Sequence, residues 1–181
     1  YNCISVLFNE QKRYKEAIEY SDKAESKAIA TNDTIERLSA HANKAAIFMR
    51  QGEFQKCVNT LTPIWSMVKQ ANYNVLMLKY LSPLLKSYLL QGKTDSIALY
   101  LPYADEASRS LAATSNGVLG ILEIKADLLG QQKKYAEQWA LFDSIAKLSS
   151  TNQTMPKDKL LATKAKCLHN MGKSAQAYQT M

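Results

Sequence analysis

The sequence predicts an all-α fold in which antiparallel helix pairs stack side by side as an α-solenoid. Three observations lead to this fold class. Apolar residues recur three and four positions apart, a spacing that places them on one face of a helix. Glycine and proline are scarce, with 6 Gly and 4 Pro in 181 residues, and no β-branched cluster predicts a strand. The whole pattern returns about every forty residues, a period typical of stacked helix pairs.

The repeat is clearest at an anchor position, two residues after the turn that joins the helices of a pair. The anchors are Tyr14, Phe54, Thr94, Tyr135 and Ser174, so the successive spacings are 40, 40, 41 and 39 residues. The position six residues before the anchor is always large: Phe8, Phe48, Tyr88, Leu129 and Leu168. The position nine residues before it is small in four of the five repeats: Ser5, Ala45, Leu85, Ala126 and Ala165. Alternating large and small side chains allow neighbouring helices to interdigitate.

The helical pattern predicts nine or ten helices in chain order. The expected segments are 1–10, 13–30, 33–50, 53–70, 74–91, 94–113, 116–130, 134–148, 156–171 and 173–181. Asp33 and Glu36 are three residues apart and form the signature of a capping box at the start of the third helix. Pro156 is suited to the first turn of the ninth helix.

Glycine marks the turn within three of the five pairs. Gly52, Gly92 and Gly172 occupy the same repeat position, where a helix ends in a left-handed residue and the chain reverses direction. The first and fourth repeats carry Lys12 and Lys133 at this position. Because these residues have a Cβ atom, we expect their turns to differ from the glycine turns.

Three prolines fall inside predicted helices: Pro63, Pro83 and Pro102. A proline in a helix removes one backbone hydrogen bond and bends the axis. We therefore expect kinks that change the curvature of the stack. The alternative is that a helix ends at the proline.

Charge and cysteine content limit the compartment and the partners. The net charge is +7, from 23 basic and 16 acidic residues, but it is dispersed, so direct nucleic-acid binding is not expected. Cys3, Cys57 and Cys167 are interpreted as small buried groups on helices, which fits the cytoplasm. The alternative is an extracytoplasmic (periplasmic) sensor domain of a membrane-anchored regulator.

No signal peptide or membrane span is recognised in the sequence. Because both ends of the sequence fall within helical patterns, we expect the chain to be an excerpt of a longer protein.

No combination of residues predicts catalysis, a metal site or a cofactor. The triplets at 92–94 and 172–174 resemble the end of a phosphate-binding loop, but they lack its earlier glycine and a preceding strand. His41 shares a repeat column with Leu81 and Leu122, so a packed ring is expected rather than a ligand. Cys167 and His169 are two residues apart and point to different faces of a helix, which does not make a zinc site.

The first repeat, with Phe8, the anchor Tyr14, and the alanines Ala17 and Ala24, resembles the tetratricopeptide repeat (TPR). Later repeats keep the size pattern and lose the identities; for example, Cys57 replaces Ala17. The resemblance implies a right-handed superhelix and covers the whole chain, residues 1–181, as one repeat domain of about 4.5 repeats. Its repeats would be residues 1–31, 32–72, 73–114, 115–153 and a truncated 154–181.

The resemblance also implies a function. Similar long, degenerate repeats occur in bacterial transcriptional regulators and signal-transduction sensors, and the first helices of such pairs line a concave groove. The residues expected to project into it are Asn43, Lys79, Lys86, Glu123, Asp127, Lys159 and Lys166. These charges either orient a peptide or form exposed ion pairs between neighbouring helices. Lys44, Lys125 and Lys164 form another column, interpreted as solvated lysines with buried stems.

Some TPR proteins hold a terminal carboxylate in a clamp of five residues. Asn43 and Lys79 match two of these positions, whereas Asn2, Val6 and Pro83 do not match the others, so clamp activity is not expected. The sequence thus favours a non-catalytic scaffold that binds a protein or peptide, as one module of a larger bacterial regulator. The alternative is a receptor for a small molecule or short peptide. A deep pocket lined by Trp65, Tyr88, Tyr103 or Trp139 would favour that alternative.

Overall fold

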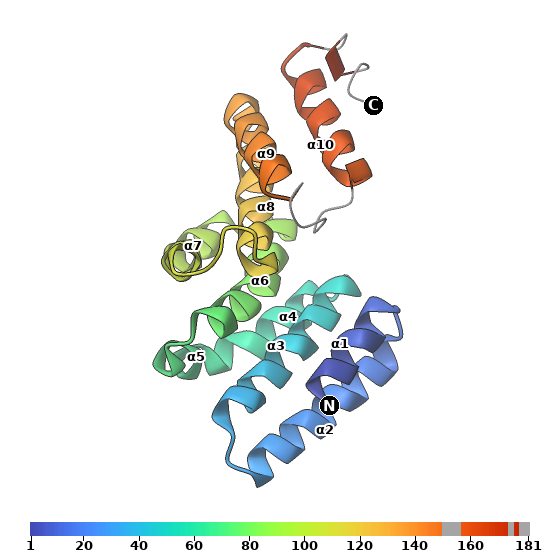
Figure 1. Ribbon diagram of the computed structural model, residues 1–181, viewed down its shortest axis with the longest axis vertical. Coiled ribbons are helices and arrows are strands. Elements are labelled where there is room, and N and C mark those ends of the chain that lie inside the picture. Colours follow the sequence, from blue (N-terminus) through green and yellow to red (C-terminus); the bar gives the residue numbers. More distant parts are fainter. Residues whose placement is uncertain (150–156, 174–175, 178–181) are drawn as a thin grey trace. The chain divides into compact units, whose positions relative to one another are not determined.

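The computed structural model describes residues 1–149, 157–173 and 176–177, and these residues form helices with no β-strand (Figure 1). The predicted all-α class is therefore confirmed for this part of the chain. The elements are α1 (Asn2–Glu10), α2 (Tyr14–Ala30), α3 (Thr34–Arg50), α4 (Phe54–Leu61), the 3-10 helix η1 (Thr62–Ile64), α5 (Trp65–Ala71), α6 (Asn74–Leu90), α7 (Thr94–Arg109), α8 (Asn116–Gln131), α9 (Tyr135–Ser149) and α10 (Lys157–Asn170). The segment predicted at 173–181 lies mostly outside the described residues.

The chain forms two compact units, Tyr1–Ser110 and Leu111–Met181, called here the N-terminal and C-terminal units. In the N-terminal unit, α1 packs on α2, α2 on α3, α3 on α4, and α6 on α7. The first helices of successive pairs also touch, α1 with α3 and α3 with α6. In the C-terminal unit, α8 packs on α9 and α9 on α10.

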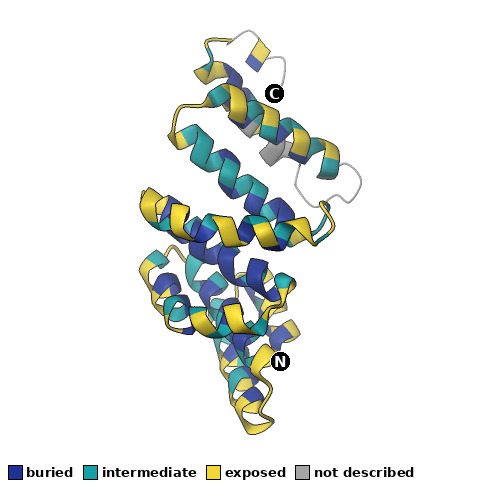
Figure 2. Ribbon diagram, turned by 90° about the vertical axis from the view of Figure 1, so that its left-hand side faces the viewer, coloured by how far each residue is buried: buried dark blue, intermediate teal, exposed yellow. Residues whose placement is uncertain are grey.

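Helix α6 forms the centre of the N-terminal core. Tyr80, Leu81, Leu84 and Leu85 on this helix are fully buried, and buried positions are coloured dark blue in Figure 2. The only charged residues of α6 are Lys79 and Lys86. An almost wholly apolar helix is stable only when neighbours cover most of its circumference. Here α3, α4 and α7 provide that cover.

All five turns within the pairs have one backbone geometry, so the expectation that Lys12 and Lys133 would form different turns is wrong. Lys12 has φ 60° and Lys133 has φ 59°, beside 70–80° for the three glycines. The amide after each left-handed residue donates to the carbonyl six residues before the anchor; for example, Arg13 donates to Phe8 at 2.9 Å and Lys134 to Leu129 at 2.9 Å. This bond closes a Schellman motif and satisfies a carbonyl at the helix end. The hydrogen bond therefore outweighs the unfavourable φ of the lysines.

The prolines divide into two kinds. Pro63 interrupts a helix predicted as continuous: α4 ends at Leu61, and Trp65 donates its backbone N–H to Thr62 in a 3-10 turn. Tyr80 Oη donates a 2.8 Å hydrogen bond to the Leu61 carbonyl at this break. By contrast, α6 continues through Pro83 and α7 continues through Pro102.

The N-cap predicted at Asp33 is confirmed. Its side chain accepts a hydrogen bond from the Glu36 amide at 2.9 Å. The reciprocal half of a capping box would occupy the Asp33 amide, but that amide donates to the Ala28 carbonyl at 2.8 Å instead. The side chain of Asp33 thus caps the start of α3, while its amide closes the turn between α2 and α3 by the hydrogen bond to Ala28.

The described core of the C-terminal unit contains fewer buried residues than that of the N-terminal unit. One cluster joins Leu119, Ala126, Phe142, Ile145 and Cys167, and Trp139 packs against it partly buried. A second cluster contains Ala165, Leu168 and Ala177. Positions at fixed distances from the anchors, such as Ala126 and Phe142, thus supply core residues in this unit as they do in the N-terminal unit.

Candidate functional site

The candidate site is the face formed by the first helices α1, α3 and α6 of the N-terminal unit. We call it the first-helix face and define it by Asn2, Glu36, Asn43 and Lys79. Asn43 and Lys79 were predicted as binding residues, and the structure places both on this face. Lys79 lies close enough to Glu36 for their charges to interact. Three successive helix pairs therefore contribute to one polar site.

Asn43 is a bridge between α1 and α3 rather than a projecting side chain. Its Nδ2 donates to Asn2 Oδ1 at 2.7 Å, and Asn2 Nδ2 donates to the Glu36 carbonyl at 3.2 Å. Both asparagines are buried. A buried amide needs such partners because an unsatisfied polar group is costly to desolvate. Asn43 therefore positions the site and does not present its amide to a ligand.

Lys79 is a partly desolvated cation beside this bridge. Burial lowers the pKa of its ammonium, and the carboxylate of Glu36 and the thiol of Cys3 oppose this effect. Among the residues that the structure describes, no carboxylate forms an ion pair with Lys79. A partly desolvated cation is stabilised further by a carboxylate or carbonyl oxygen that approaches it. Lys79 is therefore the best candidate for direct contact with a ligand.

The other predicted binding residues are not shown to join this face. Lys86 is half-buried on α6, and Glu123 and Asp127 are half-buried on α8. Lys166 is exposed on α10, while Lys159 belongs to α10 with its side chain outside the described residues. The proposal of one groove lined by all seven residues stays a prediction. Glu36 and Cys3 were not predicted as site residues, because only the packing of α1 on α3 and of α3 on α6 brings them near Lys79.

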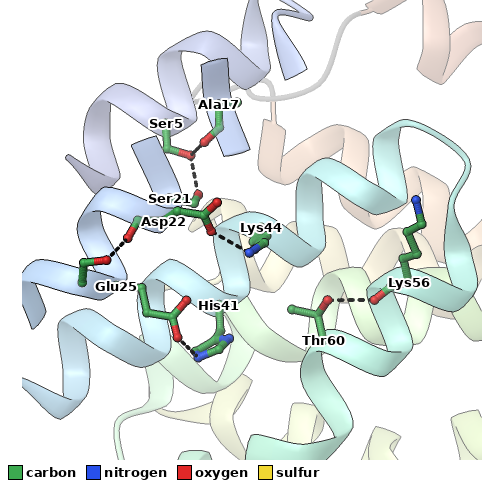
Figure 3. Close-up of polar contacts among 10 residues, drawn as sticks. Ser5, Ala17, Ser21, Asp22, Glu25, His41, Lys44, Lys56 and Thr60 are labelled. Atoms are coloured by element: carbon green, nitrogen blue, oxygen red, sulfur yellow. Dashed lines mark hydrogen bonds and ion pairs between the residues drawn. The ribbon is translucent and has the colours of Figure 1, made fainter. Parts of the chain in front are cut away.

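Two lysines of the predicted solvated column instead bridge neighbouring helices. Lys44 Nζ lies 2.6 Å from Asp22 Oδ1 of α2 (Figure 3), and Lys164 Nζ lies 2.7 Å from Asp143 Oδ1 of α9. Each lysine is ten residues before an anchor and each aspartate eight residues after one. Hydrogen bonds from Lys164 and Lys147 lower the pKa of Asp143 to about 2. The same repeat positions thus form the same ion pair in both units.

His41 belongs to the interface between α2 and α3. Its Nε2 lies 3.0 Å from Glu25 Oε1, and its ring is half-buried, as expected for a packed histidine (Figure 3). Burial lowers the pKa of His41, while Glu25 opposes this shift and Arg37 and Lys44 add to it. The pair therefore links α2 and α3.

A pocket of about 450 Å³ opens beside α5, α6 and α7. Its lining includes Lys69, Asn74, Met77, Tyr103 and Glu106. An aromatic cluster lies next to it: the ring of Trp65 is 5.4 Å from that of Tyr80, 5.3 Å from that of Tyr100 and 5.0 Å from that of Tyr103. The break at Pro63 comes directly before Trp65 and starts the helix that carries Lys69.

The cysteines divide by burial. Burial raises the pKa of Cys57 to about 11 and raises that of Cys167 above its ordinary value, so both are protonated thiols. Cys3 is exposed, contrary to the expectation that it would be buried. Among the described residues, no group of three or more His, Cys, Asp or Glu side chains is placed to hold a metal ion.

The helices of the described segments are too short or too polar to cross a membrane. Compared with known proteins, the chain matches no protein-family model and no curated protein. The fold and the contacts above are therefore the basis for the proposals that follow.

Proposed function

We propose that the chain is a non-catalytic interaction module whose helix pairs stack as a TPR-like α-solenoid. Two observations support this arrangement. The same Schellman turn closes every pair, and the same ion pair links neighbouring pairs at Lys44–Asp22 and Lys164–Asp143. Such recurrence at equivalent positions is what a stack of similar units requires. A module of this kind serves as the binding or sensing part of a larger bacterial regulator.

The binding surface is the first-helix face, and Lys79 is the observation that carries this assignment. Its ammonium is half-buried and has no ion pair within the described residues. An extended peptide with a carboxylate beside Lys79 would regain the electrostatic stabilisation lost on burial. The Asn2–Asn43 bridge holds α1 and α3 at fixed spacing below that peptide. The ligand class is therefore an acidic segment of a partner protein.

The experiment measures binding of fluorescent acidic peptides to the 181-residue chain and to Lys79→Met. The substitution keeps the length of the side chain and removes its charge. We expect at least about tenfold weaker binding, equal to about 1.4 kcal/mol. Thermal stability should not fall, because the lost cation was partly desolvated. Lys15→Met is the matched control, since Lys15 is exposed on α2. Equal affinity of Lys79→Met and the unmodified chain would overturn the assignment.

The pocket beside α5 supports a second candidate function, a receptor for a small molecule. Tyr103 lines it, and Lys69 and Glu106 provide charges of opposite sign, which suits a compact zwitterion. The test is a thermal-shift screen of amino acids and related zwitterions with the unmodified chain and with Tyr103→Ala. A stabilising ligand whose effect disappears in Tyr103→Ala would favour this function over peptide binding.

A further inference from the structure

The pocket beside α5, α6 and α7 contains a cation that lies over two aromatic rings. Lys69 Nζ is 5.4 Å from the ring centre of Trp65 and 5.8 Å from that of Tyr103. The two ring centres are 5.0 Å apart and the ring planes are inclined at 81°, so the rings form two walls of a corner. The electron-rich faces of aromatic rings attract a cation within about 6 Å. The position of Lys69 therefore marks a place where this pocket favours positive charge.

The aromatic corner is held in place by the core beneath it. Tyr80 is fully buried and stacks on Trp65, with ring centres 5.4 Å apart and planes inclined at 23°. Tyr100 meets the same indole edge-on at 5.3 Å. Stacking of Tyr80 covers one face of the indole and leaves the other face for a cation. Because the rings are fixed before any ligand arrives, little conformational entropy is lost when a ligand binds there.

Lys69 is only loosely held in this position. It is exposed, and it does not pair with Glu106, which lines the same pocket; within the part of the chain that the structure describes, neither charge has an ion-pair partner. The contact between Lys164 and Trp139 is different. Lys164 Nζ lies 5.0 Å from that ring centre, but Asp143 holds it at 2.7 Å and its side chain is only 14% exposed. Lys69 has no such restraint, so its ammonium is readily displaced from the rings.

We propose that Trp65 and Tyr103 bind a quaternary ammonium group, and that Lys69 occupies this site until such a ligand displaces it. A lysine ammonium is strongly hydrated, whereas a trimethylammonium group has no N–H donor and moves onto aromatic rings at lower cost. This inference rests on the second candidate function, a receptor for a zwitterion, and names the chemical class of the zwitterion. The class is the betaines, in which a short chain joins trimethylammonium to carboxylate. A betaine supplies a carboxylate for the displaced Lys69, while Glu106 adds negative charge to the pocket.

Ligands that differ only in N-methylation test this class. Isothermal titration calorimetry compares glycine, dimethylglycine and glycine betaine on the 181-residue chain. We expect affinity to rise along this series, with betaine bound about tenfold more tightly than glycine. Tyr103→Leu and Trp65→Leu keep an apolar side chain but remove the ring, so each should abolish the preference for betaine. Tyr103→Leu is the deciding variant, because Tyr103 is 37% exposed and its loss spares the core; circular dichroism checks the fold.

Lys69→Met tests whether the lysine occupies the site. Tetramethylammonium, which has no carboxylate, is the ligand that isolates the aromatic corner. Its affinity should rise about threefold or more in Lys69→Met, because the rings are then vacant. Lys15→Met removes the same charge at an exposed position of α2 and should leave the affinity unchanged. The gain should disappear in the double variant Lys69→Met/Tyr103→Leu, whereas a gain caused only by weaker charge repulsion would persist there.

The results separate this proposal from the receptor function on which it rests. Equal affinity for glycine and betaine would overturn the quaternary ammonium site and leave a receptor for zwitterions in place. A gain in Lys69→Met that persists without the ring of Tyr103 would also overturn the site. Binding of tetramethylammonium but of no zwitterion would support the ammonium site and overturn the zwitterion receptor. Binding of none of these ligands would overturn both.

Discussion

At the scale of single residues, the turns show how a hydrogen bond can impose an unfavourable conformation. Lys12 and Lys133 have positive φ, which costs a residue with a Cβ about 1–2 kcal/mol. Both lysines nevertheless form the same turn as the glycines, because the Schellman bond satisfies a helix-end carbonyl. The position of these turns was predicted correctly from the sequence. The presence of lysine, however, led to the wrong expectation that two of the turns would differ from the glycine turns.

Glycine at either lysine turn should stabilise the protein. We expect Lys12→Gly and Lys133→Gly each to raise the free energy of unfolding by about 0.5–1 kcal/mol, because relief of strain exceeds the added backbone entropy of the unfolded chain. Gly52→Ala should lower it by about 1 kcal/mol, since φ at Gly52 is 80° although space for a Cβ is open. Urea denaturation measures all three. Lys15→Gly, within α2, is the control and should lower the free energy of unfolding, because φ at a helical position is already favourable for lysine. If Lys15→Gly changed this free energy in the same direction and by the same amount as Lys12→Gly, the argument from strain would be contradicted.

The hydroxyl of Tyr80 should contribute to stability through the break at Pro63. It donates to the Leu61 carbonyl at the end of α4, and Tyr80 is fully buried. Tyr80→Phe leaves that carbonyl without this donor and should lower the free energy of unfolding by about 1–2 kcal/mol. Urea denaturation provides the measurement. Tyr73→Phe, at an exposed ring, should have almost no effect, and a similar loss in both variants would exclude the hydrogen bond as the cause.

His41 should make stability depend on pH. Its pKa in the folded protein is lowered from 6.5, chiefly by burial, so the unfolded chain binds more protons just below pH 6.5. Stability should therefore fall as pH decreases from 6.5 toward the lowered pKa, and rise as pH increases through the same window. Unfolding by urea between about pH 8 and about pH 5 tests this, with His41→Gln as the variant that flattens the slope. An unchanged slope in that variant would assign the dependence to other groups.

At the scale of helices, periodicity and end signals predicted most of the secondary structure. The start of α3 follows from Asp33, and the ends of α1, α3 and α6 follow from the turn position. The three prolines show what local sequence leaves open. Only Pro63 interrupts a helix, whereas α6 and α7 continue through Pro83 and Pro102. A proline within a helical pattern therefore does not by itself specify whether the helix breaks.

The candidate site shows the same limit between helices. The repeat columns of Asn43 and Lys79 were recognised from the sequence, and a role of Lys79 in binding stays a prediction. Burial of Asn43 by Asn2 depends on how α1 packs on α3, and the approach of Glu36 to Lys79 depends on how α3 packs on α6. A pattern along the sequence does not specify how two helices pack. For that reason Lys44 and Lys164 were interpreted as solvated although each forms an ion pair with a neighbouring helix.

The ion pair between α9 and α10 should hold these helices together and respond to acid. The pKa of Asp143 is lowered from 3.8 to about 2, so its contribution to stability is complete above pH 3.8 and is lost as pH falls to about 2. Asp143→Asn should lower the melting temperature at neutral pH, with a smaller difference in high salt. Lys164→Met and the double variant complete a thermodynamic cycle. Additive effects in that cycle would show that the pair contributes nothing.

At the scale of the whole molecule, the chain combines a continuous repeat with two compact units. The anchor spacing runs through the boundary between Ser110 and Leu111, since Thr94 and Tyr135 are 41 residues apart. Periodicity alone therefore gives no sign of a boundary there. The shortened end of α7, at Arg109 instead of the predicted 113, coincides with it.

The two units should differ in stability because they differ in buried apolar volume. Among the described residues, the largest fully buried side chains belong to the N-terminal unit, apart from Ile121 and Ile145. Each fully buried side chain of this size contributes about 1.5–3 kcal/mol, and the contributions within one unit act cooperatively. We expect amide hydrogen exchange of the intact chain to be slowest in α3 and α6 and faster throughout α8 and α9. Leu84→Ala, in the fully buried part of α6, should cost about 2–5 kcal/mol and accelerate exchange across α3 to α7 while leaving α8 and α9 unchanged. Acceleration that extends equally through α8 and α9 would mean that both units unfold as one.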